Sequence, residues 1–226
     1  MMDLVIFDCD GVLVNSEEIY LACELAQLRT IGVTIERSLY VATYMGLSYP
    51  EWQKRIEKLI FDCTGKPADP MFFEGLHQVV AAMIETKLTA MANANDVISQ
   101  IKKKVCVASN SGTERLHWKL AHTGLAPLFG EAVFSAQMVQ HGKPAPDLFL
   151  HAAHTLGAEP SRCVVIEDSI NGMRGAKAAG MTVIGFAGGG HCGAEHYDTL
   201  AKNGADYVVR TFIELPPLLK KLNAFE

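Results

Sequence analysis

The sequence predicts a doubly wound α/β fold, in which helices cover both faces of a parallel sheet. Short apolar runs bounded by turn residues recur along the chain, and helical patterns lie between most of them. Strands that alternate with helices in this way form parallel sheets. About ninety residues separate the first two runs, far more than a crossover needs, so we expect an inserted domain between them.

The predicted core elements follow one another in regular order. The expected strands cover residues 4–7, 105–108, 132–134, 163–166, 183–186 and 207–209. Helical patterns cover residues 113–123, 146–156 and 170–179, and Gly180 is well placed to end the last of them. Parallel sheets bind ligands beyond the carboxyl ends of their strands, where the strand order switches. Functional residues are therefore expected at these ends.

The inserted segment has a helical pattern throughout. Its expected helices cover residues 17–30, 35–44, 50–63 and 70–88. We therefore expect a helical cap domain at residues 15–89 and an α/β core made of residues 1–14 and 90–226. Because the insert begins directly after the first strand, we expect it to act as a movable lid over the site.

Composition excludes several classes of function. The chain has 226 residues, 49% of them hydrophobic, which is enough for one core and a second smaller domain. Its formal net charge of −5 and the lack of a basic stripe argue against nucleic acid or anionic lipid as the main partner.

The cysteine pattern and the N-terminal residues predict a cytoplasmic protein. The six cysteines show no Cys-x-x-Cys pairing, so we interpret them as reduced thiols. Acidic residues interrupt the N-terminal apolar run, unlike a secretory signal, and no apolar stretch is long enough for a membrane span. We therefore expect no membrane partner, and the oligomeric state is left open.

Asp8 and Asp10 are the most informative residues of the chain. They end the first apolar run with one residue between them, and Gly11 follows. An extended chain sends such a pair to one side, roughly 6 to 7 Å apart along the strand, which leaves room for a phosphate. Taken alone, the Asp-x-Asp-Gly string is more typical of two solvated aspartates in a turn. The polar segments further along the chain favour a functional site instead.

Three more polar segments follow predicted strands. They are Ala-Ser-Asn-Ser-Gly at 108–112, Gly-Lys-Pro-Ala-Pro-Asp at 142–147 and Ile-Glu-Asp-Ser-Ile-Asn-Gly at 166–172. With Asp8-Cys-Asp10-Gly-Val they resemble the four ordered motifs of the haloacid dehalogenase superfamily. The resemblance is to the branch with a helical cap after the first motif, which includes β-phosphoglucomutase and sugar-phosphate phosphatases. It covers essentially the whole chain and implies a Rossmann-like core.

The resemblance implies roles for the two aspartates that their chemistry supports. Asp8 is the expected nucleophile, since a carboxylate can accept a phosphoryl group and split one displacement into two easier ones. Asp10 is the expected general acid, which protonates the leaving oxygen and later takes a proton from water. Such a group contributes about 10² to 10⁴ in rate.

The expected phosphate-binding residues are Ser109, Asn110 and Lys143. Ser109 and the backbone amides after it enter a helix at about residue 113, and helix N-termini bind anions. Lys143 lies before two prolines that stiffen its segment. Taken alone, the first feature is as typical of a helix cap and the second of a surface lysine.

Charge counting predicts a bound Mg²⁺. Asp8, Asp168 and a phosphate dianion bring about −4, and like charges about 4 Å apart repel by roughly 4 kcal/mol per pair. Lys143 and Mg²⁺ supply about +3, and hard cations prefer oxygen ligands. By resemblance the ligands are Asp8, the backbone carbonyl of Asp10 and Asp168, while Glu167 either ligates or holds waters.

The expected reaction is hydrolysis of a small phosphorylated metabolite, a sugar or sugar-acid phosphate. The dehalogenase members lack an acid at the Asp10 position, so Asp10 favours phosphate esters. In β-phosphoglucomutase, a histidine restrains the general acid and a cap arginine binds the second phosphate. In this sequence Tyr20 occupies the position of the histidine and Tyr49 that of the arginine, so hydrolysis is favoured. Residues 43–50, with Ser48 and Tyr49, are expected to help select the substrate. A phosphosugar mutase and a catalytically silent phospho-ligand binding protein remain alternatives.

One further segment attracts notice. Gly188-Gly-Gly-His191-Cys192-Gly, followed by His196, has metal-ligating side chains, but it matches no P-loop and its ligand set is incomplete. We interpret it as a flexible loop at the rim of the site.

Overall fold

The computed structural model describes residues 2–47 and 49–225 and divides into two compact units. One unit, called here the α/β unit, comprises Met1–Asn15 and Thr89–Glu226, and the other, the helical unit, comprises Ser16–Leu88. The sequence placed these boundaries at residues 15 and 89. Where the chain passes between the units, the backbone N–H of Thr89 donates to Asn15 Oδ1 at 2.9 Å.

A six-stranded sheet forms the centre of the α/β unit, and all of its described pairings are parallel. Its strands are β1 (Leu4–Phe7), β2 (Lys104–Ser109), β3 (Val133–Ser135), β4 (Cys163–Glu167), β5 (Thr182–Phe186) and β6 (Tyr207–Val209). Their order in the sheet is β3-β2-β1-β4-β5-β6. The chain therefore builds outward from β1 in one direction and then in the other, so the switch point lies beside β1.

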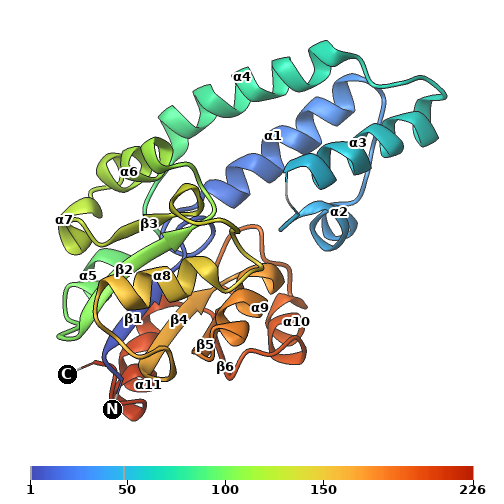
Figure 1. Ribbon diagram of the computed structural model, residues 1–226. Helices are drawn as coiled ribbons and strands as arrows, with labels where there is room; N and C mark the ends of the chain where they lie inside the picture. Colours follow the sequence, from blue (N-terminus) through green and yellow to red (C-terminus); the bar gives the residue numbers. More distant parts are fainter. Residues whose placement is uncertain (1, 48, 226) are drawn as a thin grey trace. The chain divides into compact units, whose positions relative to one another are not determined.

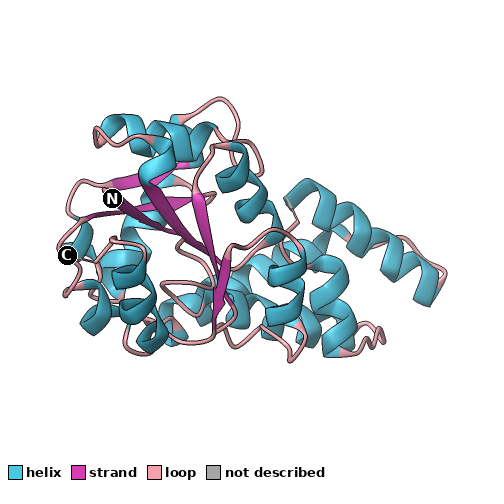
Figure 2. Ribbon diagram, turned by 90° about the horizontal axis from the view of Figure 1, so that it is seen from below, coloured by secondary structure: helices cyan, strands magenta, loops and turns pink. Residues whose placement is uncertain are grey.

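Helices cover both faces of this sheet (Figure 2), as the alternation of strands and helices predicted. They are α5 (Ala94–Ile98), α6 (Thr113–His122), α7 (Ala126–Phe129), α8 (Asp147–Thr155), α9 (Ile170–Ala178), α10 (His196–Lys202) and α11 (Leu215–Lys221). Short 3-10 helices lie at Ala136–Met138, Pro160–Arg162 and Phe212–Glu214. Because β1 and β4 are fully buried, these strands are apolar until the carboxyl end.

The helical unit contains α1 (Ser16–Thr30), α2 (Arg37–Tyr44), α3 (Tyr49–Thr64) and α4 (Pro70–Lys87). Helices α1 and α4 pack along each other (Figure 1). Buried aromatic side chains fill its centre, among them Tyr40, Trp52 and Phe73. Among the described residues, no helix combines the length and apolarity needed to cross a bilayer, and all six cysteines are free thiols.

Candidate active site

Residues from three adjacent strands meet at the switch point of the sheet. Asp8 and Asp10 follow β1, Ser109 ends β2, and Glu167 and Asp168 lie at the end of β4. The strands pair in register, with Phe7 opposite both Val107 and Ile166, so these polar groups reach the same edge. The structure therefore brings together the site residues that the sequence predicted in the α/β unit.

Gly11 allows this close approach. Its φ of 77° lies in the left-handed region, where the backbone turns away from the strand. A Cβ at this position would collide with the Asp168 carboxylate and lie 2.9 Å from the His191 ring. Only glycine lets the loop after β1 pass so near the loop after β4.

Lys143 joins two acids of the site. Its Nζ donates to Asp8 Oδ1 at 2.5 Å and to Glu167 Oε2 at 2.7 Å, and its side chain is 4% exposed. Asn110 fixes the backbone of Lys143, because its amide donates to the Lys143 carbonyl at 3.0 Å and accepts from the Lys143 N–H at 2.9 Å. The Asn110 side chain thus positions Lys143, which the sequence did not reveal.

Glu167 is held at both carboxylate oxygens. Oε2 accepts from Lys143, while Oε1 accepts from the backbone N–H and the hydroxyl of Ser169 at 3.1 and 2.8 Å. Ser169 also accepts from the N–H of Gly172 and so caps α9. Glu167 is therefore anchored between Lys143 and the start of α9.

The buried acids carry more negative charge than the lysine compensates. Asp8, Glu167 and Asp168 place one carboxylate oxygen each within 4.8 Å of the others. Burial and the neighbouring Glu167 raise the pKa of both Asp8 and Asp168 well above their ordinary values, although Lys143 opposes this. Burial lowers the pKa of Lys143, but Asp8 and Glu167 outweigh it and raise that pKa. An oxygen-lined cluster with excess negative charge suits a hard divalent cation.

Asp10 lies in a separate polar network that includes a buried lysine. Lys119 Nζ pairs with Asp10 Oδ1, and the Ser111 hydroxyl donates to Asp10 Oδ2 at 2.7 Å. Lys119 also donates to Ser111 Oγ at 3.0 Å, and its side chain is 1% exposed. Lys119 is not among the site residues that the sequence predicted. The signal was available, since Lys119 lies on the buried face of α6 with Leu116 and Leu120.

Ser109 lies at the predicted phosphate-binding turn. Its Oγ accepts from the N–H of Ser111 at 3.1 Å and lies 3.5 Å from Asp10 Oδ2. The turn leads into α6 through Gly112. Ser109 and Ser111 therefore link the turn after β2 to the loop that carries Asp10.

Two histidines that follow β5, one in the loop and one at the start of α10, contact Asp168. His191 Nε2 lies 3.1 Å from Asp168 Oδ2, and His196 Nε2 lies 2.8 Å from the Asp168 carbonyl. Burial lowers the pKa of His196. His191 lies in the loop that the sequence predicted at the rim of the site, but its side chain is only 5% exposed and contacts Asp168.

The predicted specificity residues lie in the helical unit. Tyr20 is half-buried on α1. Tyr49 is exposed on α3, where its ring stacks on Trp52 with centroids 5.7 Å apart and lies 5.5 Å from the ring of His77. Ser48 lies outside the described residues. A hollow of about 230 Å³ opens nearby, lined by Thr43, Tyr44, Arg55, Lys58, Leu59 and Asp62.

Comparison with known proteins agrees with this arrangement. The sequence pattern of haloacid dehalogenase-like hydrolases matches residues 2–180. The chain belongs to that family. This confirms the family that the four motifs predicted and the predicted fold class, a parallel α/β sheet of Rossmann-like type.

Similar proteins include sugar-phosphate phosphatases. Hexitol phosphatase B of Escherichia coli is 30% identical over 79% of this chain and 81% of its own length. The 6-phosphogluconate phosphatase of Escherichia coli is 26% identical over 84% of this chain and 85% of its own. A family hydrolase from Deinococcus radiodurans, solved with bound phosphate and sodium, is 31% identical with a TM-score of 0.87, covering 99% of this chain and 97% of that one. The family and these relatives support the predicted enzyme class, a phosphatase.

Proposed function

We propose that this protein is a Mg²⁺-dependent phosphatase that hydrolyses a small sugar or sugar-acid phosphate through a phosphorylated Asp8. The observation that carries the proposal is the buried cluster of Asp8, Glu167 and Asp168 around Lys143. The relatives that act on hexitol phosphate and 6-phosphogluconate support the substrate class.

The donor set fits Mg²⁺, because its side chains offer only oxygen atoms and their charge exceeds that of Lys143. Asp8, Asp168 and the backbone carbonyl of Asp10 would hold the ion, while Glu167 chiefly positions Lys143. When bound, the ion supplies positive charge that offsets repulsion between the acids and the phosphate.

The chain's own residues then carry the reaction in two steps. Asp8 attacks phosphorus, the phosphoryl group passes to its carboxylate, and Asp10 gives a proton to the departing ester oxygen. Water next attacks the phosphoryl group, gives its proton to Asp10 and restores the free Asp8 carboxylate. Lys143 binds the phosphate oxygens throughout. Because Lys119 and Ser111 hold the Asp10 carboxylate, proton delivery requires Asp10 to turn from this contact.

The test is hydrolysis of p-nitrophenyl phosphate, followed by a panel that includes hexitol phosphates, fructose 1-phosphate and 6-phosphogluconate. We expect phosphate release with Mg²⁺, loss of activity with EDTA, and one or more panel members that exceed p-nitrophenyl phosphate in kcat/KM. Asp8→Asn should lower kcat by roughly 10⁴-fold or more with the fold intact by circular dichroism. Asp96→Asn, an exposed change, is the matched control.

Specific outcomes would reject parts of the proposal. Substantial turnover by folded Asp8→Asn would reject the nucleophile. Conversion of β-glucose 1-phosphate to glucose 6-phosphate without equivalent phosphate release would establish the mutase instead. Ligand binding without turnover of any phosphate ester would establish the silent binding protein.

A further inference from the structure

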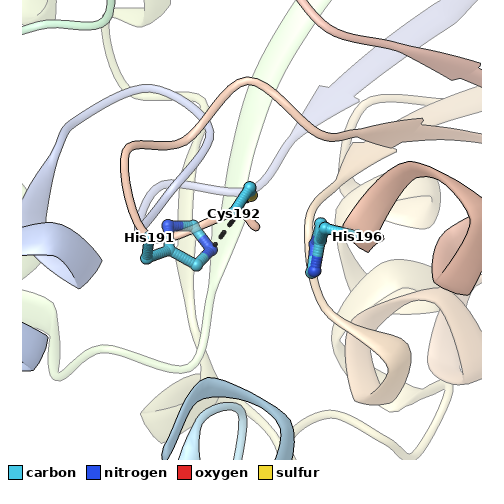
Figure 3. A group of neighbouring side chains, drawn as sticks. All are labelled: His191, Cys192 and His196. Atoms are coloured by element: carbon cyan, nitrogen blue, oxygen red, sulfur yellow. Dashed lines mark hydrogen bonds between the residues drawn. The ribbon is translucent and has the colours of Figure 1, made fainter. Parts of the chain in front are cut away.

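The loop after β5 and the start of α10 bring together three metal-ligating side chains that the proposed phosphatase reaction does not use. Figure 3 shows His191 and Cys192 side by side, with His196 facing them from the next helix. One ligand atom from each residue lies within 4.8 Å of the other two. His191 is buried, and Cys192 and His196 are half-buried.

The pair His191 and Cys192 already has the spacing of two ligands on one ion. Their Nε2 and Sγ atoms are 3.5 Å apart. A tetrahedral zinc ion with Zn–N of about 2.05 Å and Zn–S of about 2.3 Å separates its nitrogen and sulfur ligands by about 3.5 Å. The ligand atom of His196 also lies within 4.8 Å of both, so binding an ion requires only a small approach of the three side chains.

The surroundings fix the two histidines as metal ligands are usually fixed. His196 Nε2 lies 2.8 Å from the Asp168 carbonyl. Because a carbonyl only accepts, Nε2 carries the proton and Nδ1 keeps its lone pair, the tautomer of a ligating histidine anchored by the backbone. The His191 ring fits between Gly11 and Gly189, since a Cβ on either glycine would clash with it.

We infer that His191, Cys192 and His196 form a second metal site, which takes a borderline-soft divalent cation such as Zn²⁺. Two imidazole nitrogens and a thiolate favour such an ion over Mg²⁺, whereas the acidic cluster offers only oxygen. Asp168 Oδ2 lies 3.1 Å from His191 Nε2 and would supply the fourth ligand. An ion bound there draws on a carboxylate that the phosphatase reaction needs.

Cobalt titration tests the site without reference to activity. In excess Mg²⁺ and without oxygen, Co²⁺ should give the near-ultraviolet thiolate charge-transfer band with one equivalent bound, and Zn²⁺ should displace it. Cys192→Ser should abolish the band, and His196→Asn should weaken Co²⁺ binding by at least about tenfold. Cys63→Ser, which changes an exposed thiol of the helical unit, should keep it. Absence of the band in the unmodified protein, or its persistence in Cys192→Ser, would overturn the inference.

Inhibition by Zn²⁺ is a second readout, which rests on the proposed phosphatase activity. At saturating Mg²⁺, Zn²⁺ should inhibit hydrolysis, and Cys192→Ser should raise the half-inhibiting concentration at least about tenfold. Equal inhibition of both proteins would contradict coupling through Asp168. An inactive protein that still shows the cobalt band would reject the proposed function and keep the metal site.

Discussion

Both units of the molecule hold acidic side chains largely out of water, and the groups that partner these acids differ between the units. In the α/β unit, the carboxylates of Asp8, Glu167 and Asp168 converge, and Lys143 pairs with the first two. In the helical unit, Glu24 accepts a hydrogen bond from the Tyr40 hydroxyl at 2.8 Å, and Tyr40 accepts from the Trp52 indole N–H at 3.1 Å. Burial is the main cause that raises the pKa of Asp8 and Asp168 in the first cluster and of Glu24 in the second.

The two clusters differ in the positive charge that would neutralise them, a proton in the helical unit and a divalent cation in the α/β unit. Burial raises the pKa of Glu24 to about 7, despite the Tyr40 hydrogen bond that lowers it, so one proton neutralises this site near neutral pH. In the α/β unit, three carboxylates and the single positive charge of Lys143 leave an excess of two negative charges, which one proton cannot neutralise. The carboxylate oxygens also converge on one point. We therefore expect the α/β cluster to respond to a divalent cation and the helical cluster to respond to pH.

After Asp8, the largest loss of activity is expected at Asp10, an acid that already has a lysine partner. Asp10→Asn should lower kcat by about 10² to 10⁴-fold, since proton transfer to the leaving group is lost. Mg²⁺ affinity should change little, because the expected ligand at this position is the backbone carbonyl. Steady-state kinetics over a Mg²⁺ series measures both quantities. A large loss of Mg²⁺ affinity with kcat unchanged would place the Asp10 carboxylate in the metal site instead.

The substitution Glu24→Gln tests whether the acid of the helical unit responds to pH. Between pH 4.5 and about 7 the folded protein keeps a proton on Glu24 that the unfolded chain releases, so stability falls as pH rises through this window. The glutamine variant has no such loss and should be more stable than the unmodified protein by about 3 kcal/mol at pH 8 and by little at pH 4. Urea unfolding at both pH values measures this. A pH-independent difference would show that Glu24 has the same pKa in the folded and unfolded states.

The smallest effect is expected at Lys119. Lys119→Met removes the ion pair with Asp10 and keeps the Ser111 hydrogen bond, and we expect kcat to fall about tenfold, or about 1.4 kcal/mol, as Asp10 loses part of its fixed orientation. Lys202→Met on the surface of α10 is the matched control. A loss as large as that of Asp10→Asn would mean that Lys119 itself contacts the substrate.

The sequence predicted the strands, the helices of eight residues or more and the line of acids at the sheet edge because each is a local pattern, whereas the shorter helices α5, α7, α10 and α11 were not predicted. The apolar run at β1 and the residues after it specify the position of Asp8 and Asp10, since buried strands place polar residues at their ends. Mg²⁺, the phosphorylated Asp8 and the cytoplasmic location stay predictions.

Contacts between distant segments could not be predicted in the same way. Lys119 follows Asp10 by 109 positions, and only the fold of α6 against the sheet brings them together. The segment around His191 indicates a rim loop because it matches no P-loop and its ligand set is incomplete, yet Gly189 and the distant Gly11 make room for the His191 ring. A charged residue on an apolar helical face, such as Lys119, and a histidine in a glycine-rich loop, such as His191, are the sequence patterns that indicate such contacts.

Thermal unfolding with and without Mg²⁺ tests the central claim most directly, because it needs no substrate. At about one hundred times its dissociation constant a bound ion adds about 2.7 kcal/mol, which should raise Tm by roughly 5 to 10 °C. Asp10→Asn should show the same rise, and Asp168→Asn should show almost none. An equal Mg²⁺ response in Asp168→Asn, or no response in the unmodified protein, would contradict the account.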